Sequence, residues 1–405
     1  MVVRVDEPRR EQRARLDVDR AIGSRRALLD ANDARALNDH GAVSEVLALS
    51  EHGAVHVQAT LARRRVANRK DRERVGDHGP TRMTPVQHFE QLLARREPLL
   101  ALAPMQDVTD RAFWQLMSRY GGADVYYTEY FRVHPDSHLE KWILESVIDN
   151  PTGRPVVAQM IGNDIPSLVR GAKELQEHAV AAIDLNLGCP APIVYRKCAG
   201  GGLLRDVPRI EGILGALREA VQVKFTVKTR LGFDDTETID ALVPLFAKHG
   251  VDLVTIHGRT VAQMYREGVR YDLIGAARER LPCPVLANGN IGSHHDAEMV
   301  TRETGVHGLM IGRGAIRNPW LFEQIRQHVR GEAVFEPSRD DLLAYVDELY
   351  ECVTLPNTRE LDQVNRVKKH LSFFGPGLKD AETFLHDMRR CTTRAGLREV
   401  CERCF

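Results

Sequence analysis

The sequence lacks several features that would set it apart from ordinary globular proteins. None of its 405 residues lies in an apolar run near the ~18–20 residues that a membrane helix needs, and the N-terminus has no apolar signal-peptide core. Lys plus Arg and Asp plus Glu both number 56, so a nucleic-acid partner would need a local basic patch. Seven scattered cysteines argue against a disulfide framework and predict a cytoplasmic protein without a membrane partner.

The first part of the chain also lacks aromatic residues, because the first of them is Phe89. A segment rich in Arg and Asp but without aromatics can bury little apolar surface against its conformational entropy. We therefore expect residues 1–85 to be a charged extension, disordered or partly helical around residues 42–61. A basic RNA-binding arm is the alternative, which the interspersed acidic residues disfavour. Met83 is a second candidate for the start of translation.

From Leu99 onward, short β-branched apolar runs alternate with amphipathic stretches. Such runs indicate a parallel sheet covered on both faces by helices, and eight of them fit a (β/α)8 TIM barrel over residues 86–330. A doubly wound sheet would normally show a Gly-x-Gly-x-x-Gly turn after its first strand, where this chain has Pro104-Met105-Gln106-Asp107. The eight predicted strands are residues 99–105, 125–130, 155–162, 181–187, 223–228, 253–257, 284–287 and 308–311.

Residues 331–405 show no strand pattern and predict a small bundle of three or four helices. The first begins after Ser338 as N-cap, with Asp341 in its first turn. Further helical stretches cover residues 359–373, 380–390 and 394–402. The run 366–370 holds Lys368 and Lys369 and is a local basic cluster, which is either a contact for nucleic acid or a solvated helix face.

Barrel enzymes carry their function at the carboxyl ends of the strands. After the seventh and eighth predicted strands come Gly289-Asn290 and Gly312-Arg313. Glycine lets backbone N–H groups approach an anion closely, and these two loops are the usual phosphate site of the fold. They predict a phosphate group with Arg313 as its charge partner; tight turns without a ligand are the alternative.

Three other strand ends carry polar side chains suited to a bound ring. Lys228 would stabilise negative charge on such a ring, and Gln159 can both donate and accept at an imide-like edge. His257 is a candidate phosphate donor or a structural histidine.

Cys189 stands between Gly188 and Pro190 after the fourth predicted strand. The flanking residues force an irregular, accessible turn. A thiol placed there can act as an acid or a nucleophile.

Six motifs in the expected order make the chain resemble the tRNA-dihydrouridine synthases. They are residues 102–110, 184–190, 227–232, 257–260, 287–291 and 311–314. The resemblance spans residues 99–322 and extends to the helical tail, whereas the first 85 residues lie outside it. Asp107, Asn290 and the run 199–202 depart from the residues frequent in the family.

The resemblance implies an enzyme with FMN at the mouth of the barrel and NADPH or NADH as its reductant. Pro104, Met105 and Gln106 would line the flavin, while Gln159 and Lys228 would contact its ring and ribityl chain. His257, Asn288, Gly289, Asn290, Gly312 and Arg313 would hold the phosphate end. Asn186, Arg230, Arg259 and Tyr265 are candidates for the substrate side, and residues 331–405 would bind tRNA through Lys368 and Lys369.

The implied reaction reduces the C5–C6 bond of a tRNA uridine, with a hydride from the flavin N5 to C6 and a proton from Cys189 to C5. A thiol suits this role because it is largely protonated at neutral pH. One alternative is an FMN barrel reductase acting on a small pyrimidine or an enone. Another is a catalytically silent RNA-binding barrel. We expect a monomer without a stable protein partner and without a metal, since Cys391, Cys401 and Cys404 are one ligand short of a zinc site.

Overall fold

The computed structural model describes residues 83–266 and 268–405. The helix expected around residues 42–61 and nearly all of the expected extension therefore lie outside the described residues. The first described helix, α3 (Pro85–Ala94), begins at residue 85, which is the last residue of the expected extension. Its N-cap is Thr84, which forms a capping box with Gln87.

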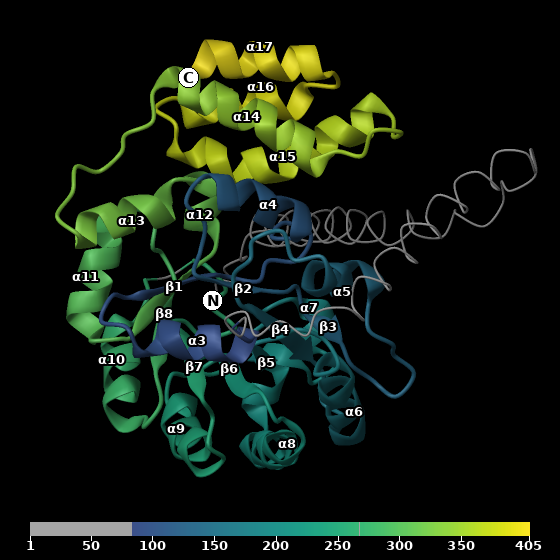
Figure 1. Ribbon diagram of the computed structural model, residues 1–405, viewed down its shortest axis with the longest axis vertical. Coiled ribbons are helices and arrows are strands. Elements are labelled where there is room, and N and C mark those ends of the chain that lie inside the picture. The colour runs from purple at the N-terminus through teal and green to yellow at the C-terminus, as the bar shows by residue number, and fades with distance from the viewer. Residues whose placement is uncertain (1–82, 267) are drawn as a thin grey trace, which may run out of the picture. The chain divides into compact units, whose positions relative to one another are not determined.

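Eight parallel strands close into a barrel, which confirms the predicted fold class (Figure 1). Each predicted apolar run overlaps one strand, although two strands extend past the predicted ends at residues 228 and 287. Strand β1 pairs with both β9 and β2 while β2 pairs with β4, so the sheet has no open edge there. A two-residue strand, β3 (Phe131–Arg132), adds to β4 beyond the predicted set. The barrel strands are β1 (Leu99–Leu102), β2 (Val125–Tyr127), β4 (Val156–Ile161), β5 (Ala182–Leu187), β6 (Lys224–Arg230), β7 (Leu253–His257), β8 (Val285–Asn288) and β9 (Gly308–Ile311).

Helices surround the barrel and bury apolar faces against it. Several begin at an Asp or Ser N-cap whose side chain accepts a backbone N–H of the first turn, as Asp110, Asp164, Asp206 and Ser293 do. The helices are α4 (Arg111–Arg119), α5 (Lys141–Ile148), α6 (Ile165–Leu175), α7 (Pro192–Tyr195), the 3-10 helix η1 (Gly200–Arg205), α8 (Val207–Ala220), α9 (Thr238–Lys248), α10 (Tyr271–Arg280), α11 (His294–Thr304), α12 (Arg313–Arg317) and α13 (Leu321–Val329).

The C-terminal part is helical, as predicted. It consists of α14 (Arg339–Val353), α15 (Glu360–Phe374), the short η2 (Gly375–Gly377), α16 (Ala381–Arg390) and α17 (Arg394–Cys404). The expected start of α14 is confirmed, because Ser338 and Asp341 form a capping box.

Aromatic contacts join this helical part to the barrel. Tyr345 of α14 packs against Tyr120 and Trp320, with ring centroids 5.4 and 6.0 Å apart. The His370 ring of α15 stacks on Phe113 of α4 at 5.2 Å, and its Nε2 lies 3.0 Å from the carbonyl oxygen of Val108. Val108 lies in the loop between β1 and α4, so α15 contacts the segment that leads away from the barrel mouth.

Two aspartates lie at the opposite end of the barrel, where the strands begin, and each makes hydrogen bonds and ion pairs there. Asp124 precedes β2, accepts the Leu100 N–H at 2.9 Å and forms ion pairs with Arg95 and Arg326. Asp252 precedes β7, accepts the Phe225 N–H at 2.8 Å and pairs with Arg218 at 2.9 Å. Each carboxylate therefore satisfies a strand N–H and at least one cation at once.

Within residues 83–266 and 268–405, no helix is both long and apolar enough to cross a bilayer.

Candidate active site

A buried polar network lies inside the barrel beneath its mouth. Register places Gln159 of β4 beside Asp184 of β5, and Gln159 Nε2 donates to Asp184 Oδ2 at 2.7 Å. Asn186 Nδ2 donates to Gln159 Oε1 at 2.8 Å, and Thr226 Oγ1 donates to Asp184 Oδ1 at 2.6 Å. Burial raises the pKa of Asp184 to about 6, although the hydrogen bonds from Thr226 and Gln159 lower it. The network fixes the orientation of Gln159 and Asn186.

Asn186 also shapes the turn that carries Cys189. Its Oδ1 accepts the backbone N–H groups of Gly188 at 3.0 Å and of Cys189 at 2.9 Å. The thiol is partly buried. Burial raises its pKa, more than hydrogen bonds from the Ala191 backbone and from Tyr130 lower it. The sulfur is therefore held as a neutral thiol, which is the form that can donate a proton.

The glycine run after Cys189 is needed for close packing against this turn. Gly200 has a φ of +54°, and a Cβ at this position would lie 3.0 Å from the Cβ of Cys189 and 2.8 Å from Ile161. Any other residue would be strained in backbone conformation and would push on the thiol-bearing turn. The signal for this role was visible in the sequence as three consecutive glycines.

Lys228 projects from the carboxyl end of β6 toward β8. Its Nζ donates to Asn288 Oδ1 at 3.1 Å, and Asn288 Nδ2 donates to the Met310 carbonyl of β9 at 2.7 Å. Burial and the nearby Arg230 lower the pKa of Lys228 to about 8, while Asp184 opposes this shift. The structure thus brings together Lys228 and Asn288, two residues that the sequence assigned to one cofactor.

His257 lies at the end of β7, on the phosphate side of the predicted site. Burial lowers its pKa well below the usual value, and the charges of Arg230, Lys228, Arg259 and Arg313 add to the effect. Its ring fills the space in front of Gly289, where a Cβ would lie 3.1 Å from His257 Cδ2 and where φ is +123°. Only glycine fits there, so the backbone after β8 can approach a ligand beside a neutral imidazole.

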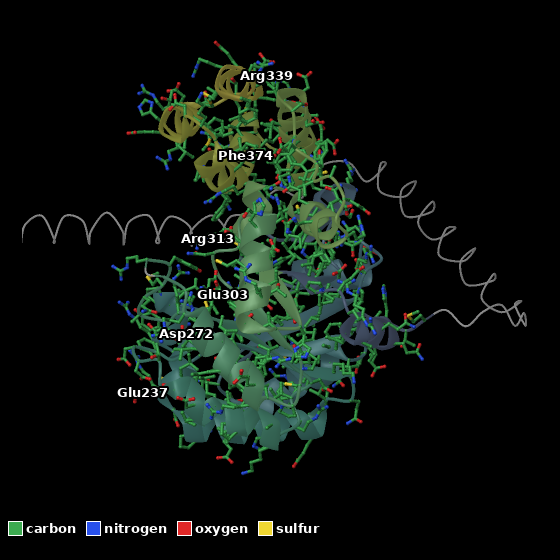
Figure 2. All side chains as sticks on the ribbon, turned by 90° about the vertical axis from the view of Figure 1, so that its left-hand side faces the viewer. Glu237, Asp272, Glu303, Arg313, Arg339 and Phe374 are labelled. Atoms are coloured by element: carbon green, nitrogen blue, oxygen red, sulfur yellow. The ribbon has the colours of Figure 1, made fainter. Side chains whose placement is uncertain are left out.

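Arg313 begins α12 directly after Gly312, at the edge of the mouth nearest the helical part. Helix α12 packs against α15, and Figure 2 accordingly shows Arg313 between Glu303 of the barrel wall and Phe374. Asn290 is exposed and adopts a left-handed backbone with φ of +52°. Gly312 and Arg313 are partly buried.

The loop after β1 holds Pro104, Met105 and Gln106, all partly buried. Gln106 Nε2 donates to Glu129 Oε2 at 2.5 Å, and burial raises the pKa of Glu129 to about 7. The buried Oε1 of Gln106 has no hydrogen-bond partner within the described part of the chain. An unpaired buried acceptor is costly, so this amide is ready to bind a donor on a ligand.

Besides Asn186, three residues at the mouth were expected on the substrate side, and they differ in exposure. Arg230 is 2% exposed and donates to the carbonyls of Gly188, Thr260 and Met264 at 2.8–3.0 Å. Arg259 is 1% exposed, with Nη1 3.3 Å from His257 Nε2. Tyr265 is 49% exposed, and its ring lies 4.6 Å from the Arg313 guanidinium and 5.4 Å from that of Arg230. Arg230 therefore joins the loops after β5 and β7, and Tyr265 is the one of the three that faces solvent.

Lys368 and Lys369 belong to α15 and not to the mouth. Lys369 is exposed, whereas Lys368 Nζ donates to the Arg389 carbonyl of α16 at 3.0 Å.

Sequence reasoning missed Glu129, Tyr130 and Asp184 as parts of the site. Glu129 and Tyr130 were assigned to the end of the second strand, yet β2 ends at Tyr127. The available signal was a carboxylate at the end of an apolar run, which is costly to bury without a function. Asp184 carried the same signal inside the fourth strand.

The sequence is similar to a known protein family and to several known proteins. The family model described as dihydrouridine synthase (Dus) matches residues 101–405. A probable tRNA-dihydrouridine synthase of Rickettsia conorii is 32% identical over 291 residues, which cover 70% of this chain and 86% of the relative. The tRNA-dihydrouridine synthase B of Pseudomonas putida is 38% identical over 247 residues, covering 60% and 72% of the two chains.

Among solved structures, histamine dehydrogenase from Rhizobium sp. 4-9 matches with a TM-score of 0.46 and 15% identity, over 62% of this chain and 48% of that chain. The extent of the family match and the similarity to two named relatives confirm the assignment suggested by the six sequence motifs. The chain is an enzyme that belongs to the dihydrouridine synthase family.

Proposed function

We propose that this enzyme reduces the C5–C6 double bond of uridines in tRNA to 5,6-dihydrouridine, with FMN as its resident cofactor and NADPH or NADH as the reductant. The observation that carries the proposal is one arrangement at the mouth. A neutral thiol, Cys189, lies on the loop after β5, and the partly buried cation of Lys228 lies on the adjacent strand β6. The names of the two relatives support tRNA as the substrate.

The residues at the mouth fit a flavin nucleotide. The unpaired Gln106 Oε1 can accept from a ring N–H. The cations Lys228, Arg230, Arg259 and Arg313 all act on His257, and such a concentration of positive charge suits a phosphate and an electron-rich ring. Gly289, Asn290 and Gly312 would bring backbone N–H groups to the phosphate beside Arg313 and His257, with Asn288 holding Lys228 in place.

When bound and reduced by NADPH or NADH, FMN would supply a hydride to C6 of the uracil ring. The chain itself then has to deliver a proton to C5, and the Cys189 thiol is the candidate general acid. Its raised pKa keeps the proton on sulfur at neutral pH, and the Asn186 carbonyl oxygen holds the turn through two backbone N–H groups. Lys228 would stabilise negative charge on the flavin ring.

Uridine must leave its base stack to enter such a mouth, which costs a few kcal/mol. Tyr265 is exposed at the rim and could stack on an everted base. Arg230 and Arg259 would act there mainly by holding the rim loops, given their burial. We assign residues 86–330 to the flavin-binding barrel and residues 331–405 to tRNA backbone contacts, with Lys368 and Lys369 as candidates.

An absorbance spectrum of the purified full-length protein is the first test. Flavin bands near ~450 nm are expected, since the cofactor brings its own chemistry, and a colourless protein that still binds tRNA would favour a silent RNA-binding barrel. The second test supplies NADPH and tRNA from a strain lacking dihydrouridine. Formation of dihydrouridine supports the proposal, whereas reduction only of free pyrimidines or enones would favour a small-molecule reductase.

A further inference from the structure

Away from the mouth, α11 and α13 bring together histidine and glutamate side chains that no step of the proposed reaction uses. His295 and Glu298 lie three residues apart on α11, so they share one face of that helix. His328 comes from α13. One nitrogen of each imidazole and one carboxylate oxygen all lie within 4.8 Å of one another. Three ligand atoms from two helices are thus already gathered around one point.

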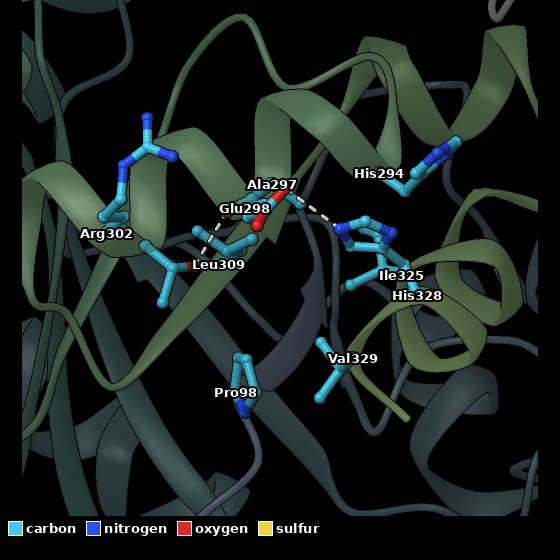
Figure 3. A pocket seen from close by; sticks show the side chains of 10 residues that line it. Pro98, His294, Ala297, Glu298, Arg302, Leu309, Ile325, His328 and Val329 are labelled. Atoms are coloured by element: carbon cyan, nitrogen blue, oxygen red, sulfur yellow. Dashed lines mark hydrogen bonds and ion pairs between the residues drawn. The ribbon is translucent and has the colours of Figure 1, made fainter. Parts of the chain in front are cut away.

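The contacts within this group are direct. His328 Nε2 lies 3.0 Å from Glu298 Oε2, and Figure 3 shows these two side chains facing each other across the gap between the helices. His294 is next to them, with its ring centroid 4.1 Å from that of His295 and 5.0 Å from that of His328. Three imidazoles and one carboxylate therefore share a small volume.

We propose that His295, Glu298 and His328 bind a divalent transition metal ion of the zinc class. Two imidazole nitrogens and one carboxylate oxygen are a ligand set that Zn²⁺ accepts, with the fourth position open to water or to His294. The site is partly exposed, so an ion can reach it from solvent. Its consequence is structural: the ion ties α11, which follows the β8 loop, to α13, which leads into the helical C-terminal part.

A groove adjoins the site and explains why such a tie would matter. Its volume is about 420 Å³, and apolar and polar side chains line it in equal number: Pro98, Ala297, Leu309, Ile325 and Val329, with His294, Glu298, Thr301, Arg302 and His328. Direct packing between α11 and α13 is incomplete along this groove. A metal bridge at its rim would supply part of the cohesion that side-chain packing does not.

Titration of the full-length, flavin-loaded protein with Zn²⁺, in the absence of any polyhistidine tag, tests the proposal. Calorimetry should show one ion per chain in the wild type. Removing a ligand in His328→Ala or Glu298→Gln should weaken the affinity at least about 10- to 100-fold. The matched control is His386→Ala, which removes another exposed histidine paired with a carboxylate, Asp387 at 2.9 Å, and should leave the affinity unchanged.

Two further readouts make the outcome decisive. Zn²⁺ should raise the melting temperature of the wild type but not that of His328→Ala. Co²⁺ should give weak visible bands that disappear in His328→Ala, without the intense near-ultraviolet absorption of a cobalt–thiolate bond. Binding that survives in His328→Ala and Glu298→Gln, no stoichiometric binding to the wild type, or a thiolate spectrum arising from Cys391, Cys401 or Cys404 would each overturn the proposal.

Discussion

The two ends of strand β6 carry lysines in opposite electrostatic situations. Lys224, where the strand begins, pairs with Glu90 at 2.8 Å and with Asp252 at 3.6 Å, and its pKa is raised chiefly by the bond to Glu90. Lys228, four residues on, has an amide as its bonded partner, and burial lowers its pKa to about 8. The charge of Lys224 is therefore balanced by carboxylates, whereas no carboxylate pairs directly with Lys228 within the described residues.

This difference extends to the whole barrel. Asp124 and Asp252 saturate the beginnings of the strands with ion pairs and strand hydrogen bonds. At the other end of the barrel, burial and the charges of four cationic side chains lower the pKa of His257. Charge that is compensated within the chain serves stability, whereas charge left over is available to a ligand.

The largest effect is expected for Cys189→Ala. Loss of a general acid should lower the turnover number on tRNA by about 10²- to 10⁴-fold, while the flavin spectrum and the melting temperature stay close to wild type. Steady-state formation of dihydrouridine measures the change. Cys198→Ala, an exposed cysteine of the following loop, is the control, and full turnover in Cys189→Ala would refute the assigned role.

Asp124→Ala should have the largest effect on stability. It removes the carboxylate that accepts from the Leu100 N–H and pairs with the guanidinium groups of Arg95 and Arg326, and breaking a buried pair costs about 3–5 kcal/mol. Denaturant unfolding measures this loss. Asp240→Ala, at an exposed pair with Arg280, should change stability by no more than ~0.5 kcal/mol. Release of flavin from a stably folded Asp124→Ala would contradict the separation of the two ends.

Lys228→Met and Lys224→Met compare the ends of one strand directly. Removing Lys228 should weaken FMN binding by roughly 10- to 100-fold, as expected for a charge-assisted hydrogen bond of about 1.5–3 kcal/mol. Lys224→Met should leave FMN affinity unchanged and lower stability only slightly. Fluorescence titration of the flavin-free proteins measures both affinities, and equal losses in the two variants would remove the distinction between the ends.

The pH dependence of FMN binding should report the same lysine. Because the pKa of Lys228 is lowered to about 8, its charge is lost as pH rises through that value, and FMN affinity should fall with it. In the flavin-free protein the unfolded chain binds more protons than the native one between pH 8 and 10.5. The contribution of this group to stability therefore rises with pH over that range. Lys228→Met should lack both trends, and identical profiles in wild type and variant would exclude the assignment.

The smallest effect is expected on tRNA affinity. Charge reversal in the double variant Lys368→Glu/Lys369→Glu should reduce tRNA binding severalfold and lower the salt dependence by about one unit per lost phosphate contact, without changing FMN affinity. Lys173→Glu on α6, an exposed lysine outside the helical part, is the control. Filter-binding measurements over a range of salt concentrations distinguish the variants, and unchanged affinity would remove α15 from the tRNA surface.

Local patterns predicted the architecture well because β-branched runs and helix caps are local signals. All eight barrel strands and the start of α14 at Ser338 follow from such signals. The burial of Arg230 could not be predicted, since it depends on carbonyls of two separate loops that approach only in the closed barrel. His295 and His328 were missed for the same reason, because the fold joins residues on two different helices.

The stacking of His370 on Phe113, together with Tyr345 against Tyr120 and Trp320, has a consequence for how the molecule melts. Detaching the C-terminal helices would uncover these rings and leave the Val108 carbonyl without its imidazole partner. The barrel and the helices that follow it should therefore unfold cooperatively. Calorimetry of residues 83–405 should record a single endotherm, without a separate transition for either part.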